Sequence, residues 1–396
     1  MFETLQQLAP DPILGLIGKF KSDLRGQKID LGVGVYRDNY ANTPVLAAVK
    51  DAERLLHAAE DSKAYIGPAG DVLFNRLIAD LAFGHGHSVI KNQRVVTLQT
   101  PGGCGALRVG AELAIRSAPD CTIWVSDPSW ANHVPLLGNA GLKLEKYRYY
   151  DAEKHSVDFD GMMSDLAKAS AGDIVLLHAS CHNPSGADLS PAQWSDLAAL
   201  LADKNLTPFV DMAYQGFGES IDADAAGLRL LAEELPEMLL AVSCSKNFGL
   251  YKERTGALCI VSQTQGASDI AMSHMMSIVR GIYSMPPAHG ASVVAQILSS
   301  ESLRRQWLSE LQAMSARIQK MRLEFSALMR TELQSERFDF VATQRGMFSF
   351  LGITSEQVGR LAKDHGIYTT DNSRISLAGL NDSNIERFCM SLKQIL

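Results

Sequence analysis

Reactive side chains follow several apolar segments in the middle of this 396-residue chain. Lys246 comes just after the apolar run 239–243, although a lysine side chain prefers solvent. An amine kept in a cleft can form a Schiff base with a carbonyl compound, and the positive charge of Arg254, eight residues later, would lower its pKa. The alternative is a lysine that simply leaves a strand for water.

Asp211 and Tyr214 end another apolar run, FVDMAY. A buried carboxylate needs a cationic partner, because its burial is otherwise costly. A protonated ring nitrogen of a ligand would be such a partner, and an internal arginine would serve equally. Asp211 is therefore a candidate for holding a charged heterocycle.

A glycine loop, TPGGCG, stands before a helical pattern that begins near Ala106. Backbone N–H groups at the start of a helix bind anions, whereas a lone glycine cluster is more often a tight turn. The loop matches neither G-x-G-x-x-G with an acidic residue downstream nor G-x-x-x-x-G-K-[ST]. This argues against a nicotinamide dehydrogenase and against a nucleoside triphosphate site.

The elements that must position these residues are short β-branched runs separated by stretches of helical period. Continuous apolar strands that alternate with helices predict an α/β fold with a mainly parallel sheet covered on both faces. Ligands bind beyond the carboxyl ends of such strands, so we expect the polar residues there to share one site. Strands are expected at 94–100, 123–127, 173–179, 208–213, 239–243 and 256–261, with helices such as 190–204 and 225–235 between them.

The C-terminal third shows a different pattern. Apolar residues from Leu303 to Leu328 recur every three or four positions, which predicts one long helix over 302–333. A coiled coil would share this spacing, but a helix that links two α/β units fits the rest of the chain better. Strands at 346–351 and 374–378 around a helix at 356–365 predict a smaller α/β unit. We expect an N-terminal arm with part of the small domain (1–45), a large domain (46–300), and the linking helix with the small domain (301–396).

Composition restricts the partners. Apolar residues make up 46% of the chain and the net charge is −7, without a basic block, which argues against nucleic acid. The apolar runs are far shorter than the ~20 residues that span a membrane, and the N-terminus shows no signal peptide. The six cysteines form no C-x-x-C pair and no zinc spacing, so we expect no metal site and a reducing, cytoplasmic compartment.

Several motifs together resemble the class I pyridoxal-phosphate aminotransferases, within the branch of the aspartate and aromatic-amino-acid enzymes. The resemblance extends from DPILGL (11–16) and GVGVYRD (32–38) to the C-terminal helix. It implies the type I fold of pyridoxal-phosphate-dependent transferases, with a mainly parallel seven-stranded sheet in the large domain. The motifs are QTPGGCGALRVGAE (99–112), HNPSGADL (182–189), DMAYQGFG (211–218), SCSKNFGLYKERTGA (243–257), YSMPPAHGASVV (283–294) and RGMFSF (345–350).

The resemblance implies roles for the candidate residues around pyridoxal 5′-phosphate. Lys246 would bind the cofactor covalently and Asp211 would keep its ring nitrogen protonated. Tyr214 and Asn183 would donate to the ring oxygen. His133 and His178 would stand behind the site, although core packing explains them equally well. The ring would stack on Trp130, and the phosphate would lie among Gly103, Cys104, Ser243, Ser245 and Arg254.

The same resemblance implies how substrate is recognised. Arg374 would take the α-carboxylate in a bidentate pair, and Gly34 would let the backbone approach it. Trp130 and Asn183 would also touch the substrate. Arg280 would reach in from a second subunit for a side-chain carboxylate, and Tyr65 would reach the neighbour's phosphate, which implies a homodimer.

Two positions depart from the family pattern. Cys104 stands where the family usually has threonine or serine, and a thiol is a weak donor. Met285 stands where the family often has asparagine or serine, which would make the pocket locally more apolar. The two departures therefore concern one contact to the phosphate and the local polarity of the substrate pocket.

The function expected from these residues is a step of amino-acid metabolism. It is ping-pong transfer of the amino group between L-aspartate or L-glutamate and 2-oxo acids such as 2-oxoglutarate. Aromatic amino acids are expected as further substrates. An enzyme with Phe and Tyr as main substrates is an alternative. A pyridoxal-phosphate lyase or decarboxylase on the same fold is another, although a clamped carboxylate is poorly placed to leave. A non-catalytic effector-binding module is disfavoured, because no helix-turn-helix segment precedes residue 30.

Overall fold

The computed structural model describes residues 1–7 and 12–396 and has a seven-stranded sheet at its centre. Residues 8–11, including the start of the DPILGL segment, lie outside the described part. Neighbouring strands are parallel except at β10, which is antiparallel to both β2 and β9. The expected α/β fold is thereby confirmed. The sheet order is β2 (Val95–Pro101), β10 (Thr255–Val261), β9 (Met238–Ser243), β8 (Thr207–Met212), β7 (Ile174–His178), β3 (Thr122–Asp127) and β4 (Lys143–Arg148).

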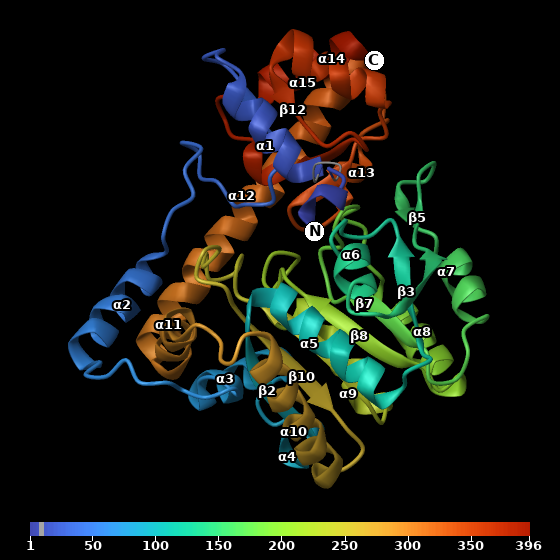
Figure 1. Cartoon of the computed structure of the whole chain (residues 1–396). Helices are drawn as coiled ribbons and strands as arrows, with labels where there is room; N and C mark the ends of the chain where they lie inside the picture. Colours follow the sequence, from blue (N-terminus) through green and yellow to red (C-terminus); the bar gives the residue numbers. More distant parts are fainter. Residues whose placement is uncertain (8–11) are drawn as a thin grey trace.

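Helices cover both faces of this sheet (Figure 1). Three two-stranded sheets lie apart from it: β1 (Ile29–Asp30) with β12 (Ile367–Tyr368), β5 (Tyr150–Asp151) with β6 (Ser156–Val157), and β11 (Phe348–Phe350) with β13 (Arg374–Ser376). The helices are α1 (Pro12–Ser22), α2 (Ala47–Ala59), α3 (Val72–Phe83), α4 (Ser88–Lys91), α5 (Gly102–Ser117), α6 (His133–Gly138), α7 (Phe159–Leu166), α8 (Pro191–Asp203), α9 (Ala226–Glu234), α10 (Gln265–Ile282), α11 (Ala288–Ser299), α12 (Glu301–Leu333), α13 (Phe340–Thr343), α14 (Ser355–His365) and α15 (Ile385–Ile395).

The central strands are apolar on both sides because both sides are buried. Leu239 and Leu258 pack into a core with α5 and α10. Their neighbours Leu240 and Cys259 pack into the core on the opposite face, which α8 and α9 help to form. This two-sided burial explains why these strands have continuous apolar sequences rather than alternating ones.

Strand β4 was not singled out from the sequence. Its sequence, KLEKYR, is charged, and only Tyr147 of its six residues is buried. The strand pairs on one side only, with β3, so it is the edge of the sheet. Charged side chains are common on edge strands, where they oppose pairing with another chain, and they hide the apolar signal of a strand.

The long helix predicted over 302–333 is confirmed as α12, and its apolar stripe faces the core. Its N-terminus is capped by Ser300, whose side chain accepts from the backbone N–H of Leu303. Trp307 lies in this stripe, donates from Nε1 to the carbonyl of Asn247 at 2.7 Å, and stacks on Phe248 with ring centroids 4.4 Å apart. The helix therefore supports the loop that carries Lys246.

Helices α13, α14 and α15 and strand β12 gather at one end of the molecule, together with α1 (Figure 1). Helix α14 begins with a capping box between Thr354 and Gln357, and Gly366 caps its C-terminus. The expected strands at 346–351 and 374–378 are shorter in the structure, where β11 and β13 have three residues each. None of the helices in the described ranges is long and apolar enough to cross a membrane.

Candidate active site

One pocket of about 270 Å³ lies where strands β7, β8 and β9 end. The residues that line it come from separate parts of the chain, as expected for the carboxyl edge of a parallel sheet. The predicted site residues that the structure brings together here are Gly34, Gly103, Cys104, Trp130, His178, Asn183, Asp211, Tyr214, Ser243, Ser245, Lys246, Arg254 and Arg374.

Lys246 lies in the loop between β9 and β10. Its Nζ is 4.9 Å from the centre of the Tyr214 ring. Burial lowers the pKa of the Lys246 amine, although the Asp211 carboxylate acts in the opposite direction. A lysine with a lowered pKa more readily offers the neutral amine that nucleophilic and base chemistry need. Burial raises the pKa of Tyr214, so its phenol stays protonated and can donate a hydrogen bond.

Asp211 is the fifth residue of β8 and its carboxylate is almost completely buried. The partner of this carboxylate is a histidine rather than the internal arginine considered above: His133 Nε2 lies 2.9 Å from Oδ2. Burial raises the pKa of Asp211, but the hydrogen bond and charge of His133 lower it, and the net shift is downward. Asp211 is thus an anion with one oxygen engaged behind the pocket.

Three histidine rings continue from this carboxylate into the protein. His133 is bonded through Nδ1 to Ser129 Oγ at 2.8 Å, and its ring centre is 5.2 Å from that of His178. The ring of His178 is in turn 4.3 Å from that of His182. Burial lowers the pKa of His178 to about 3, so this ring is neutral near pH 7. Both predicted histidines therefore adjoin the carboxylate.

The glycine loop forms one end of the pocket. Helix α5 begins at Gly102, four residues earlier than the sequence indicated, so the glycines themselves form its first turn. Gly102 has φ +73°, and a Cβ there would stand 2.5 Å from Arg254 Nη2. The guanidinium therefore lies against the N-terminus of α5. With the hydroxyls of Ser243 and Ser245 in the same lining, this end suits a phosphate group.

Cys104 belongs to the first turn of α5 and lines the same end. Burial raises the pKa of its thiol, which outweighs the lowering effect of Arg254. The thiol is therefore neutral near pH 7, and it is the weakest hydrogen-bonding group at this end of the pocket.

Arg374 forms the opposite end of the pocket. Its Nη1 donates to Asn183 Oδ1 at 3.1 Å and its Nη2 to the carbonyl of Gly32 at 2.6 Å. Its Nε is buried and has no hydrogen-bond partner among the described residues. The guanidinium also lies 4.3 Å over the ring of Phe348. A fixed guanidinium with an unsatisfied donor can bind a carboxylate.

Gly34 lies beside this guanidinium, and there is a steric reason why the residue at this position is glycine. A Cβ at Gly34 would come within 2.7 Å of Phe348 Cζ. Any larger residue would displace either the Phe348 ring or the backbone that lines the pocket. The predicted role of Gly34, a close backbone approach at the carboxylate end, agrees with this crowding.

Tyr65 and Arg280 do not line the pocket of their own chain. Tyr65 is 93% exposed in the segment between α2 and α3. Arg280 lies near the end of α10, is exposed, and donates to Ser284 Oγ. Met285, the second departure from the family pattern, also lies outside the lining.

Five lining residues were missed by the sequence reasoning: Ile13, Leu107, Ala213, Tyr251 and Phe348. Tyr251 accepts a hydrogen bond from the backbone N–H of Tyr36 at 2.9 Å and so joins the N-terminal segment to the Lys246 loop. Tyr251 and Phe348 stand within motifs already quoted, and their aromatic type in a loop was the available signal. Ile13 stands within the quoted segment DPILGL, but an isoleucine in an apolar helix gives no further signal of a site.

Comparison with known proteins gives consistent matches over the whole chain. The family model described as "Aminotransferase class I and II" matches residues 26–392. The aromatic-amino-acid aminotransferase of Paracoccus denitrificans is 46% identical over 97% of each chain. The aspartate aminotransferase of Escherichia coli is 45% identical over the full length of both. The crystal structure of the Burkholderia pseudomallei aromatic-amino-acid aminotransferase, covalently bound to pyridoxal phosphate, superposes with a TM-score of 0.98 at 40% identity and covers 100% and 99% of the two chains.

Proposed function

The chain belongs to the family of class I and II aminotransferases, and from this premise we propose that it moves the α-amino group between L-amino acids and 2-oxo acids such as 2-oxoglutarate. The amino acids proposed are L-aspartate, L-glutamate and aromatic L-amino acids. Its relatives include both aspartate and aromatic-amino-acid aminotransferases, so the expectation from the sequence is confirmed at the level of the family. One observation carries the proposal for this chain's own residues. An amine, a buried carboxylate and a guanidinium with an unsatisfied donor line one pocket.

The residues fit the cofactor that this function requires, pyridoxal 5′-phosphate. The N-terminus of α5, Arg254 and the two serines suit its phosphate, and Asp211 suits a protonated ring nitrogen. Lys246 offers an amine to its aldehyde. Tyr214 and Asn183 are the donors for its ring oxygen, and Trp130 is the aromatic surface for its ring. When bound, this group withdraws the electrons of the substrate Cα–H bond into its ring.

Each step of the protein's part in the reaction is assigned to a particular group. Arg374 binds the α-carboxylate and so fixes the orientation of Cα. Lys246 Nζ then accepts the proton from Cα and returns it later in the reaction, for which its lowered pKa is favourable. Asp211, with His133 behind it, holds the proton on the ring nitrogen. Arg374 also disfavours decarboxylation, the competing outcome, because a carboxylate in a bidentate pair is poorly placed to leave.

We further propose that the active unit is a homodimer in which Tyr65 and Arg280 reach the neighbouring pocket. Neither side chain lines its own pocket, and Tyr65 is exposed although it is aromatic. Other large apolar side chains are also exposed, among them Phe2, Val72 and Ile270, and Ile270 shares helix α10 with Arg280. A second copy of the chain would cover such side chains.

Two further proposals concern the domain organisation of the chain and the cellular compartment of the protein. We propose a large domain over 46–300, an N-terminal arm with part of the small domain over 1–45, and the linking helix with the rest of the small domain over 301–396. In support, β1 pairs with β12 rather than with the central sheet. We also propose a reducing, cytoplasmic compartment. In support, the six cysteines are free thiols.

The function is tested by measuring amino transfer from aspartate and from phenylalanine to 2-oxoglutarate with the purified protein and added pyridoxal phosphate. We expect kcat/KM values within the range of active enzymes for both donors, and a visible absorption band that decreases when aspartate is added without an acceptor. A protein that binds the cofactor but transfers no amino group from either donor would contradict the proposal.

Arg280→Ala is expected to lower kcat/KM for aspartate by about 10²-fold or more, while phenylalanine changes by less than about tenfold. The reason is that only aspartate carries a second carboxylate for this guanidinium to bind. The two donors are compared on the same preparation, so phenylalanine is the internal control. Equal losses for both donors would show that Arg280 is not the side-chain determinant.

A further inference from the structure

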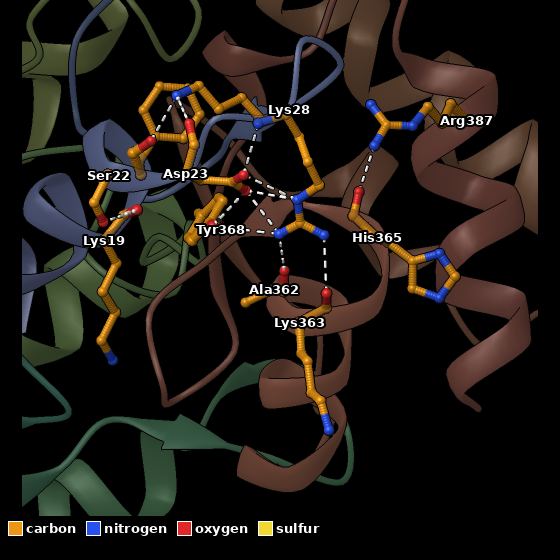
Figure 2. Close-up of polar contacts among 11 residues, drawn as sticks. Lys19, Ser22, Asp23, Lys28, Ala362, Lys363, His365, Tyr368 and Arg387 are labelled. Atoms are coloured by element: carbon orange, nitrogen blue, oxygen red, sulfur yellow. Dashed lines mark hydrogen bonds and ion pairs between the residues drawn. The ribbon is translucent and has the colours of Figure 1, made fainter.

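The C-terminal end of helix α1 is held by a compact polar cluster that plays no part in the chemistry described above. Figure 2 shows Asp23 between Lys28, Tyr368 and the last turn of α14 at Ala362 and Lys363. Asp23 follows directly after α1, and Tyr368 is the last residue of β12. The cluster therefore joins two segments separated by more than three hundred residues.

Arg25 makes the central contacts of this cluster. Its Nε lies 2.8 and 3.0 Å from the two carboxylate oxygens of Asp23. Its Nη1 and Nη2 donate to the carbonyls of Lys363 and Ala362 at 2.8 and 2.7 Å. Those carbonyls belong to the last turn of α14, where the carbonyl of Ala362 also accepts from the backbone N–H of Gly366, and the helix end favours a cation.

The other members of the cluster fix the direction of α1. Tyr368 donates from its hydroxyl to Asp23 at 2.7 Å, and its ring meets Phe20 edge-on with centroids 5.5 Å apart. Lys28 Nζ donates to the carbonyls of Phe20 and Asp23 and lies 4.5 Å over the Phe20 ring. The hydrogen bonds of Arg25 and Tyr368 hold the pKa of Asp23 well below its usual range, so the cluster stays charged near pH 7.

The first turn of α1 reaches the active-site pocket. Ile13 lines the pocket that contains Lys246 and Arg374, and also the adjoining cavity beside Thr370 and Asn372. Helix α1 has eleven residues and is roughly 16 Å long. A small rotation at its anchored end therefore becomes a larger displacement at Ile13.

We propose that Asp23, Arg25 and Tyr368 form a clamp that positions α1 over the substrate pocket, with Arg25 as its principal positioning residue. The clamp attaches α1 to β12, which leads through the 369–373 segment to Arg374 on β13. Ile13 and Arg374 are thereby held in one arrangement, in which an apolar side chain covers the end of the pocket where the carboxylate binds. This inference rests on the proposed function, because it assigns the covered ligand as the amino-acid substrate.

The test is Arg25→Met, which keeps an unbranched apolar side chain and removes every hydrogen bond of the guanidinium. We expect hydrogen exchange of the amides of residues 13–22 to become at least about tenfold faster. We expect KM for aspartate to rise about tenfold while kcat changes by less than about twofold, because the variant loosens the cover and leaves the reacting groups in place. Tyr368→Phe removes the hydroxyl, which donates to Asp23 and accepts a 3.5 Å hydrogen bond from Arg25 Nη2, but it keeps the ring and the remaining bonds of Arg25, so it should show the same effects at smaller size.

Matched variants separate a cover from a merely structural contact. Ile13→Ala should raise KM in the same way without accelerating exchange in α1. If Arg25 acts through Ile13, the double variant should have the KM of the single variants rather than the product of their effects. Arg305→Met, which removes an exposed guanidinium paired with Glu301, should change neither readout.

The possible outcomes are distinct. Unchanged exchange in both Arg25→Met and Tyr368→Phe would show that the cluster does not hold α1. Faster exchange with unchanged KM would show that α1 does not cover the pocket. Either result overturns the clamp while leaving transamination intact, whereas failure of the proposed function would appear as a lack of amino transfer in the unmodified protein.

Discussion

Lys246→Ala is expected to lower the rate of amino transfer from aspartate by at least about 10⁴-fold. The substitution removes the amine that is proposed to bind the cofactor and to carry the Cα proton. No other lysine lines the pocket formed by the described residues, so no neighbouring amine can replace it. The measurement is the rate of oxaloacetate formation with 2-oxoglutarate as acceptor.

A chemical readout accompanies the kinetic one. After borohydride reduction and digestion, the unmodified protein should carry a pyridoxyl group on the peptide 243–251, and Lys246→Ala should carry none there. Lys252→Ala is the matched control, since this exposed lysine lies in the same loop. A pyridoxyl group on any other peptide of the unmodified protein, or transfer at the normal rate without Lys246, would disprove the assignment.

Asp211→Ala is expected to lower kcat by about 10³-fold or more. Under the proposed assignment, removal of the carboxylate would leave no group to hold a proton on the ring nitrogen of the cofactor, and the ring would lose much of its capacity to accept electrons. His133→Asn keeps the carboxylate and removes its buried partner, so we expect a smaller loss. Stopped-flow measurement of the half-reaction with aspartate would separate these effects from product release.

The pH dependence gives a second test of Asp211. Because its pKa is lowered in the folded protein, the carboxylate is ionised throughout the neutral and mildly acidic range. Loss of the His133 hydrogen bond should raise the pKa of Asp211, since burial then acts with less opposition. We therefore expect the acidic limb of the rate profile to move to higher pH in His133→Asn. An unshifted acidic limb would show that His133 does not control this carboxylate.

Much of the central fold could be read from local sequence because its strands are buried on both faces. The six expected strands agree with β2, β3, β7, β8, β9 and β10 to within one residue at each end. The expected helix start at Ser190 is confirmed with its capping box. Since strand ends fix the site, Asp211, Lys246 and the glycine loop could be placed together from the sequence.

Contacts between distant segments could not be predicted in this way. Asn183 and Arg374 are 191 residues apart, and nothing in either segment predicts their hydrogen bond. Asp211 clearly needed a partner, but the choice of His133 over an arginine depends on the position of α6 at the end of β3. Strand β4 was hidden by the charges of an edge. The roles of Tyr65 and Arg280 depend on a second chain and came from the family resemblance alone.

The reversed direction of β10 has a consequence for how the pocket is assembled. An antiparallel strand begins at the edge where its neighbours end, so the hairpin between β9 and β10 delivers Lys246 and Arg254 to the same edge. The proposed covalent anchor and the proposed phosphate anchor are then spaced by one short stretch of backbone. Under this assignment, the separation of the two groups would limit the length of a cofactor that can contact both.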